Sequence, residues 1–166
     1  MKISLVNIIK EHLQTFKKSD GRFLVEDLII FLGIPTISAI VIFMFVLREI
    51  PENFVNSLLT SFSILTPLLF GLLPMTFSLI DNKFVSSNGF DLVNEFKANV
   101  LFTILLSLVL VLVLLVWFLT VNWKFYCDLI ICWLFIVILL HLFLILNRFN
   151  KLINEYIKLL NKYKNT

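Results

Sequence analysis

Four apolar stretches, each close to the length that a helix needs to cross a bilayer, constrain the fold more than any other feature of this sequence. They occupy residues 27–47, 57–80, 99–120 and 129–146. A helix crosses the hydrocarbon core with about 20 apolar residues and satisfies its own backbone hydrogen bonds there. With 60% hydrophobic and only 15% charged residues, the chain is predicted to be an all-α polytopic membrane protein, a four-transmembrane-helix bundle.

The N-terminal segment, residues 1–20, has the pattern of an amphipathic helix. Its apolar residues share one face: Leu5, Val6, Ile9, Leu13 and Phe16. Lysines and other polar residues lie on the opposite face, and His12 lies at the edge between the two. We therefore expect a helix that lies on the membrane surface or against another helix, with His12 at the interface.

The second apolar stretch carries small and polar residues at helical spacing. At about 100° per residue they fall on one stripe, formed by Thr60, Ser63, Pro67, Gly71, Pro74, Ser78 and Asp81. Small residues let membrane helices approach closely, and hydroxyls bond across such contacts. Each proline also removes a backbone donor and bends a helix. The stripe predicts a helix inside the bundle or lining a cavity, either tightly packed or acting as a gate or hinge.

The third and fourth stretches differ in character. The third is mostly Leu and Val, so we expect it on the outside of the bundle, although Asn99, Thr103 and Ser107 share one side that should contact other helices. The fourth continues without a breaker into the tail, residues 147–166, as one long helix extended into the cytoplasm. Its apolar positions form a heptad seam, read as an assembly surface: Leu142, Ile145, Phe149, Leu152, Tyr156, Leu159 and Tyr163.

The orientation follows from the basic residues. Twelve of the 14 lysines and arginines lie near the termini and the middle loop, which places both termini and that loop in the cytoplasm. That side carries a net charge of +4, which suits a bilayer with anionic lipids. Trp117, Trp123, Phe125 and Tyr126 mark the opposite membrane surface as an aromatic belt. The expected location is the inner or plasma membrane, with no direct contact to nucleic acid.

Few titratable groups are placed for chemistry. His141 lies well inside the fourth stretch, as a neutral histidine bonded to another helix or as a proton relay or pH sensor. Glu26 and Asp27 stand at the start of the first stretch, as interfacial capping groups or as an embedded ion- or proton-binding site. Catalytic motifs and metal-ligand spacings are missing, so we expect no enzyme activity, no cofactor and no metal site.

Residues 63–73, with the sequence SILTPLLFGLL after a short first loop, resemble the small four-span bacterial membrane proteins of anti-phage defence operons, of the Kiwa membrane-subunit type. The resemblance implies a membrane-resident sensor or anchor that forms an oligomer and recruits a soluble partner.

Three functions remain open from the sequence. The leading one is a non-enzymatic, homo-oligomeric membrane subunit whose cytoplasmic helices bind a soluble protein partner. The alternative is a small channel or pore-forming effector lined by the stripe on the second stretch. A third is a proton-coupled transporter that uses His141 or Glu26.

Overall fold

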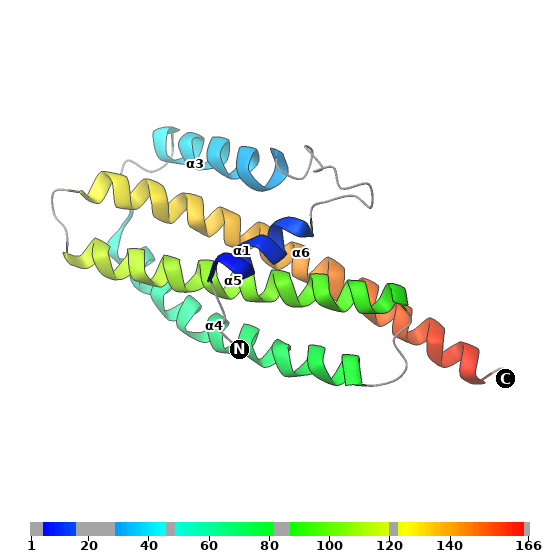
Figure 1. The fold of residues 1–166 in the computed structure, drawn as a ribbon. Helices are drawn as coiled ribbons and strands as arrows, with labels where there is room; N and C mark the ends of the chain where they lie inside the picture. The colour runs from blue at the N-terminus through cyan, green and yellow to red at the C-terminus, as the bar shows by residue number, and fades with distance from the viewer. Residues whose placement is uncertain (1–4, 16–28, 46–48, 82–86, 120–122, 165–166) are drawn as a thin grey trace.

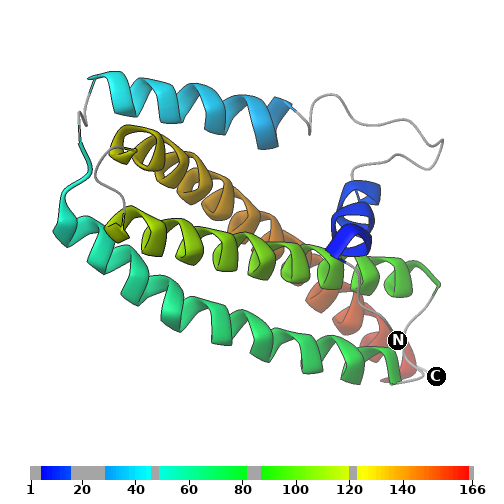
Figure 2. The same ribbon diagram turned by 60° about the vertical axis from the view of Figure 1, so that its left-hand side comes forward.

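The computed structural model describes residues 5–15, 29–45, 49–81, 87–119 and 123–164. Over these residues the chain is all-α, as predicted. The helices are α1 (Leu5–Gln14), the short π-helix η1 (Ile29–Gly33), α3 (Ile34–Phe45), α4 (Glu52–Asp81), α5 (Ser87–Leu119) and α6 (Lys124–Lys164). Successive long helices run in opposite directions, and α1 lies across α5 and α6 (Figures 1 and 2).

Three helices, α4, α5 and α6, are long and apolar enough to cross a membrane. The chain therefore has the character of a helical membrane protein. The first predicted span is described only as η1 followed by α3, a run of 17 residues, 29–45, so the prediction of four spans is supported for three of them. Pro35 explains the π-helical start, because its ring and missing N–H disturb the preceding turn of a regular helix.

The sequence predicted a four-helix bundle, and in the structure the long helices lie side by side in a row. α5 and α6 pack against each other at the centre, α3 lies on α6, and α4 lies on α5 (Figure 2). Aromatic side chains bridge the row, since the ring of Phe135 on α6 lies 6.3 Å from that of Phe54 and 6.5 Å from that of Phe62, both on α4. Because, among the described helices, the backbone of α4 packs closely only on α5, α4 lies at the edge of the row.

The central position of α5 contradicts the prediction that the third stretch lies on the outside. One face of α5 is fully buried, and it carries Asn99, Thr103, Ser107, Leu110 and Leu114. The hydroxyls of Thr103 and Ser107 bond to carbonyls of their own helix, each at 2.8 Å. Small side chains whose polar groups are already satisfied allow a close approach of α6. The expected bundle contact of Asn99, Thr103 and Ser107 is thus confirmed.

α6 is a single helix from Lys124 to Lys164, as its uninterrupted pattern predicted. The predicted assembly seam is used within the chain over the described part of its length. Ile145 and Leu152 are buried in one core cluster with Val93, Phe96 and Val100 of α5, and Leu142 and Phe149 pack against it. Tyr156 is exposed, and the side chains of Leu159 and Tyr163 lie outside the described residues. The seam from Leu142 to Leu152 is therefore not a free surface, because α5 covers it.

Candidate functional site

The stripe on α4 faces away from the rest of the chain. Its described members are all exposed: Thr60, Ser63, Pro67, Gly71 and Pro74. The buried face of α4, which carries Val55, Leu58, Phe62, Thr66 and Leu69, lies on the opposite side of the helix at about 100° per residue. The expectation that α4 sits inside the bundle or lines a cavity is therefore wrong for the single chain.

The polar groups of the stripe are satisfied locally. The hydroxyl of Thr60 donates to the carbonyl of Asn56 at 3.0 Å, and that of Ser63 donates to the carbonyl of Leu59 at 2.7 Å. A Cβ built on Gly71 would meet nothing within 4 Å. Pro67 cannot donate a backbone hydrogen bond to the carbonyl of Ser63. The outward face of α4 thus carries a stripe of small and hydroxyl-bearing residues beside the exposed apolar side chains of Ile64, Leu68 and Phe70, on a helix long enough to span a membrane. Ser78 and Asp81 carry side chains outside the described residues.

A buried polar cluster joins α1 to the centre of the row. His12 of α1 is only 3% exposed, and its Nδ1 lies 2.8 Å from Oδ1 of Asn99 on α5. Its Nε2 lies 3.2 Å from Nε2 of His141 on α6. His141 in turn places Nδ1 2.8 Å from the carbonyl oxygen of Val137. Phe102 of α5 stacks on the His12 ring with the centroids 3.9 Å apart. Hydrogen bonds therefore join α1 to α5 and to α6, which both lie far from α1 in the sequence.

The docking of α1 by His12 was missed from the sequence, which placed His12 at the membrane interface. α1 turns its polar edge inward, while the apolar side chains Val6, Ile9 and Leu13 remain exposed. The amphipathic pattern identified two faces correctly but not which of them meets the protein. His12 and His141 are the only two histidines in the chain, and this was the one signal that could have suggested a pair.

Burial and nearby charged groups both affect the pKa of His12. Arg148 is 8% exposed and lies 3.4 Å from a carboxylate oxygen of Glu95, while Lys97 and Glu11 pair more loosely at 3.9 Å. Burial lowers the pKa of His12 from 6.5 to about 3, and His141 and Arg148 contribute in the same direction. His12 is therefore neutral when α1 is docked.

His141, predicted as a neutral histidine bonded to another helix or as a proton site, is buried; it meets the Val137 carbonyl of its own helix and the His12 ring of α1. Whether it relays protons stays a prediction. Glu26 and Asp27 lie outside the described residues. Within the described part of the chain, no group of three His, Cys, Asp or Glu residues is arranged to hold a metal ion.

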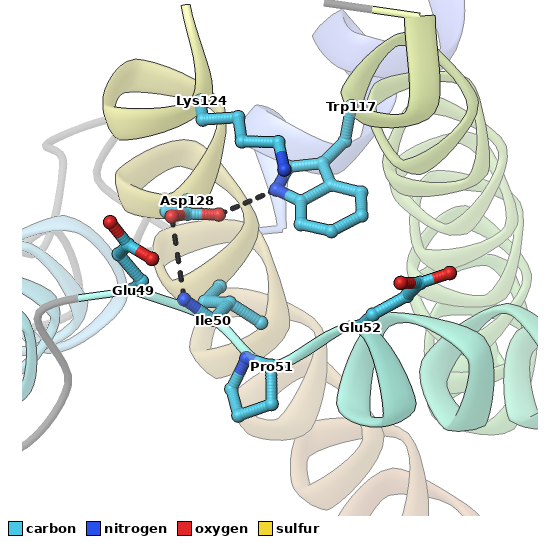
Figure 3. A pocket seen from close by; sticks show the side chains of 7 residues that line it. All are labelled: Glu49, Ile50, Pro51, Glu52, Trp117, Lys124 and Asp128. Carbon is cyan, nitrogen blue, oxygen red and sulfur yellow. Dashed lines mark hydrogen bonds between the residues drawn. The ribbon is translucent and has the colours of Figure 1, made fainter. Parts of the chain in front are cut away.

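A second polar site lies at the opposite end of the long helices, where α5 ends and α6 begins (Figure 3). Asp128 is 2% exposed and accepts hydrogen bonds from the indole N–H of Trp117 at 2.7 Å and from the backbone N–H of Ile50 at 3.4 Å. The ammonium of Lys124 lies 4.7 Å from the centre of the Trp117 ring. Trp117 therefore points inward to Asp128, whereas Trp123, Phe125 and Tyr126 of the predicted aromatic belt are exposed.

These residues, with Glu49, Pro51 and Glu52, line a hollow of about 370 Å³. The paired hydrogen bonds of Asp128 fix the connection before α4 to the start of α6. The arrangement explains how this end of the protein is held together, because a buried carboxylate needs such donors.

No protein-family model matches the chain, and the searches of curated proteins and of solved structures found no match either.

Proposed function

We propose that this chain is a non-enzymatic integral membrane protein that assembles with copies of itself through α4. The observation that carries the proposal is the exposed stripe from Thr60 to Pro74. Facing lipid, small and hydroxyl-bearing side chains offer little contact area, and the Ser63 carbonyl lacks the donor that residue 67 would supply. Against a second α4, the same residues permit close approach and interhelical bonding. A neighbouring copy is therefore the better environment for this face.

The membrane topology in this proposal has four passes, with η1 and α3 as the first. The 17 residues from 29 to 45 are at the lower end of the length that spans a bilayer. Trp133 of α6 donates its indole N–H to the hydroxyl of Thr36 at 3.1 Å, which ties α3 to a long spanning helix. With four passes, both termini lie on the same side, and the distribution of basic residues makes that side the cytoplasm.

The proposed role of the assembly is that of a membrane anchor or sensor that recruits a soluble partner. The cytoplasmic end would present α1 and the end of α6, where Tyr156, Ile157 and Lys158 are exposed. Interfaces commonly use exposed aromatic side chains as anchors. A membrane subunit of a bacterial defence system, as the resemblance of residues 63–73 implies, would work in this way.

The experiment is a purification in mild detergent with the neighbouring genes co-expressed, followed by measurement of the mass of the complex. We expect a homo-oligomer that Ser63→Leu disrupts. Ser61→Leu is the matched control, because Ser61 is also an exposed serine bonded to its own helix, at 2.8 Å, but lies outside the stripe. A monomer in the wild type, or equal effects of the two variants, would overturn the proposal.

A pore is the second candidate, favoured by the hydroxyls of Thr60 and Ser63 on the open face of α4. If these face a water-filled axis in the oligomer, purified protein should conduct ions in liposomes and Ser63→Leu should abolish the flux. An oligomer without flux would leave the anchor role and remove the pore.

A further inference from the structure

α1 has three sides that differ in chemistry. At about 100° per residue, Ile8 and His12 fall together on the side that meets α5 and α6. A second side is apolar and exposed, and it carries Val6, Ile9 and Leu13. The third side is polar and exposed, and it carries Asn7, Glu11 and Gln14. One short helix therefore offers separate faces to the protein, to an apolar medium and to water.

An ion pair fixes the direction of the polar side. Glu11 pairs with Lys97 of α5 at 3.9 Å, whereas His12 stacks on Phe102, which lies further along α5. Lys97 is the last charged residue before the uncharged run 98–119 of this membrane-length helix. The polar side of α1 therefore points toward the charged start of α5. The apolar side lies nearly opposite Glu11 on the helix, so it points toward the uncharged run.

The depth of α1 follows from the lengths of the two central helices. At 1.5 Å per residue, Asn99 lies about 30 Å from Leu119 along α5, and His141 lies about 26 Å from Lys124 along α6. The hydrocarbon core of a bilayer is about 30 Å thick. Exposed aromatic residues mark one surface of that core at the far end of these helices, namely Trp123, Phe125 and Tyr126. α1 therefore lies at the level of the other surface.

The surroundings of α1 at this level suit a bilayer. α1 crosses α5 and α6 instead of running along them (Figures 1 and 2), so it lies roughly in the plane of that surface. Shortly after His141, the α6 side chains Phe143 and Leu146 are also exposed and apolar. Lys10 lies between the apolar and the polar side of α1, where its carbon chain can follow the apolar side and its ammonium can reach lipid headgroups.

We propose that α1 is an in-plane membrane helix, which inserts Val6, Ile9 and Leu13 among the acyl chains of one leaflet while His12 holds it to α5 and α6. The sequence left open whether this segment lies on the membrane or against another helix, and in this arrangement different faces of one helix do both. The inference rests on the membrane-spanning role of α5 and α6 in the proposed function, but it does not depend on assembly through α4.

The test measures which medium surrounds each side of α1 in the full chain, reconstituted into nanodiscs of phosphatidylcholine and phosphatidylglycerol. A nitroxide spin label is attached to one introduced cysteine, after the buried Cys127 and Cys132 are replaced by alanine. Collisions of the label with oxygen, which concentrates among acyl chains, are compared with collisions with a nickel chelate, which stays in water. Ile9→Cys probes the apolar side, and Asn7→Cys is the matched control, because residue 7 is also exposed on α1. Leu112→Cys, at an exposed site within α5, is the reference for lipid.

We expect the ratio of oxygen to nickel collisions at residue 9 to approach the ratio at residue 112, and the ratio at residue 7 to be several-fold lower. Equal nickel access at residues 9 and 7 would overturn the proposal, because the apolar side would then face water. Little nickel access at either site would also overturn it, because lipid would then surround α1. Free nickel access at residue 112 would remove the spanning role of α5, so it distinguishes a failure of the proposed function from a failure at α1 alone.

A second measurement keeps the native cysteines. Benzoyl-phenylalanine replaces Ile9, the nanodiscs are irradiated, and the intact mass of the protein is measured. An increase by the mass of one phospholipid is the expected result. A cross-link to a second copy of the chain would overturn the proposal, because a protein would then cover the apolar side. The absence of a lipid adduct would overturn it as well, with the same replacement at Leu112 as the positive control.

Discussion

The assignment of α5 to the centre and α4 to the edge makes a quantitative prediction for two serines. Ser107 of α5 is 0% exposed and faces the core, whereas Ser63 of α4 is exposed. Each hydroxyl donates to a carbonyl of its own helix, at 2.8 Å and 2.7 Å respectively. The two sites therefore have the same local chemistry and differ mainly in what surrounds them.

Replacing Ser107 by leucine forces two extra heavy atoms into a close helix contact. Overpacking of this kind costs about 1–3 kcal/mol of the free energy of unfolding. Ser107→Ala removes only an intrahelical bond and should cost about 1 kcal/mol or less. Ser63→Leu, which adds the same atoms on an open face, should change the stability of the single chain by within about 0.5 kcal/mol.

The assay is unfolding by sodium dodecyl sulfate in mixed micelles, at a protein-to-micelle ratio low enough to keep the chain monomeric. Tryptophan fluorescence is a suitable signal because Trp117 is buried between α5 and α6. A larger loss of stability for Ser63→Leu than for Ser107→Leu would show that the two helices are exchanged and would refute the helix order.

Three further predictions follow from individual contacts. Asp128→Leu removes a charge-assisted bond to Trp117 and should lower the free energy of unfolding by about 1.5–3 kcal/mol in the same assay; no change would mean that the bond does not form. Leu152→Glu places a charge against α5 and should destabilise the single chain, whereas Tyr156→Glu on the exposed side should leave its stability unchanged; equal effects would contradict the packing of α6. Nuclear magnetic resonance of labelled histidines should find the His12 imidazole neutral at pH 5; a pKa near 6.5 would show that it is not buried.

The helical, membrane-spanning character of the chain was predictable because long apolar runs leave few alternatives to a helix. Which helices lie at the centre and which lie at the edge was not predictable from the sequence. Small and polar residues mark close packing, and they occur on both the second and the third stretch. Both the stripe from Thr60 to Asp81 and the side with Asn99, Thr103 and Ser107 were predicted to contact other helices, yet only the second of them is buried within the chain. A sequence pattern identifies a packing face, but it does not specify which partner covers it.

The histidine cluster shows a second limit. His12 and His141 are 129 positions apart, and their contact depends on how α1 crosses α5 and α6. The amphipathic pattern of α1 suggested an apolar contact face, but hydrogen bonding to Asn99 and His141 turned the polar edge inward. The heptad pattern of α6 predicted an assembly surface, but its residues Ile145 and Leu152 pack against α5 of the same chain. Periodicity alone does not distinguish a helix of a neighbouring chain from a neighbouring helix of the same chain.

The mass of the protein in mild detergent tests the central claim most directly, because that claim is that the open face of α4 is covered by another copy. The account predicts a defined homo-oligomer for the wild type and for Ser61→Leu, and a smaller species for Ser63→Leu. A monodisperse monomer in all three would contradict it, since the stripe from Thr60 to Pro74 would then face lipid without a partner.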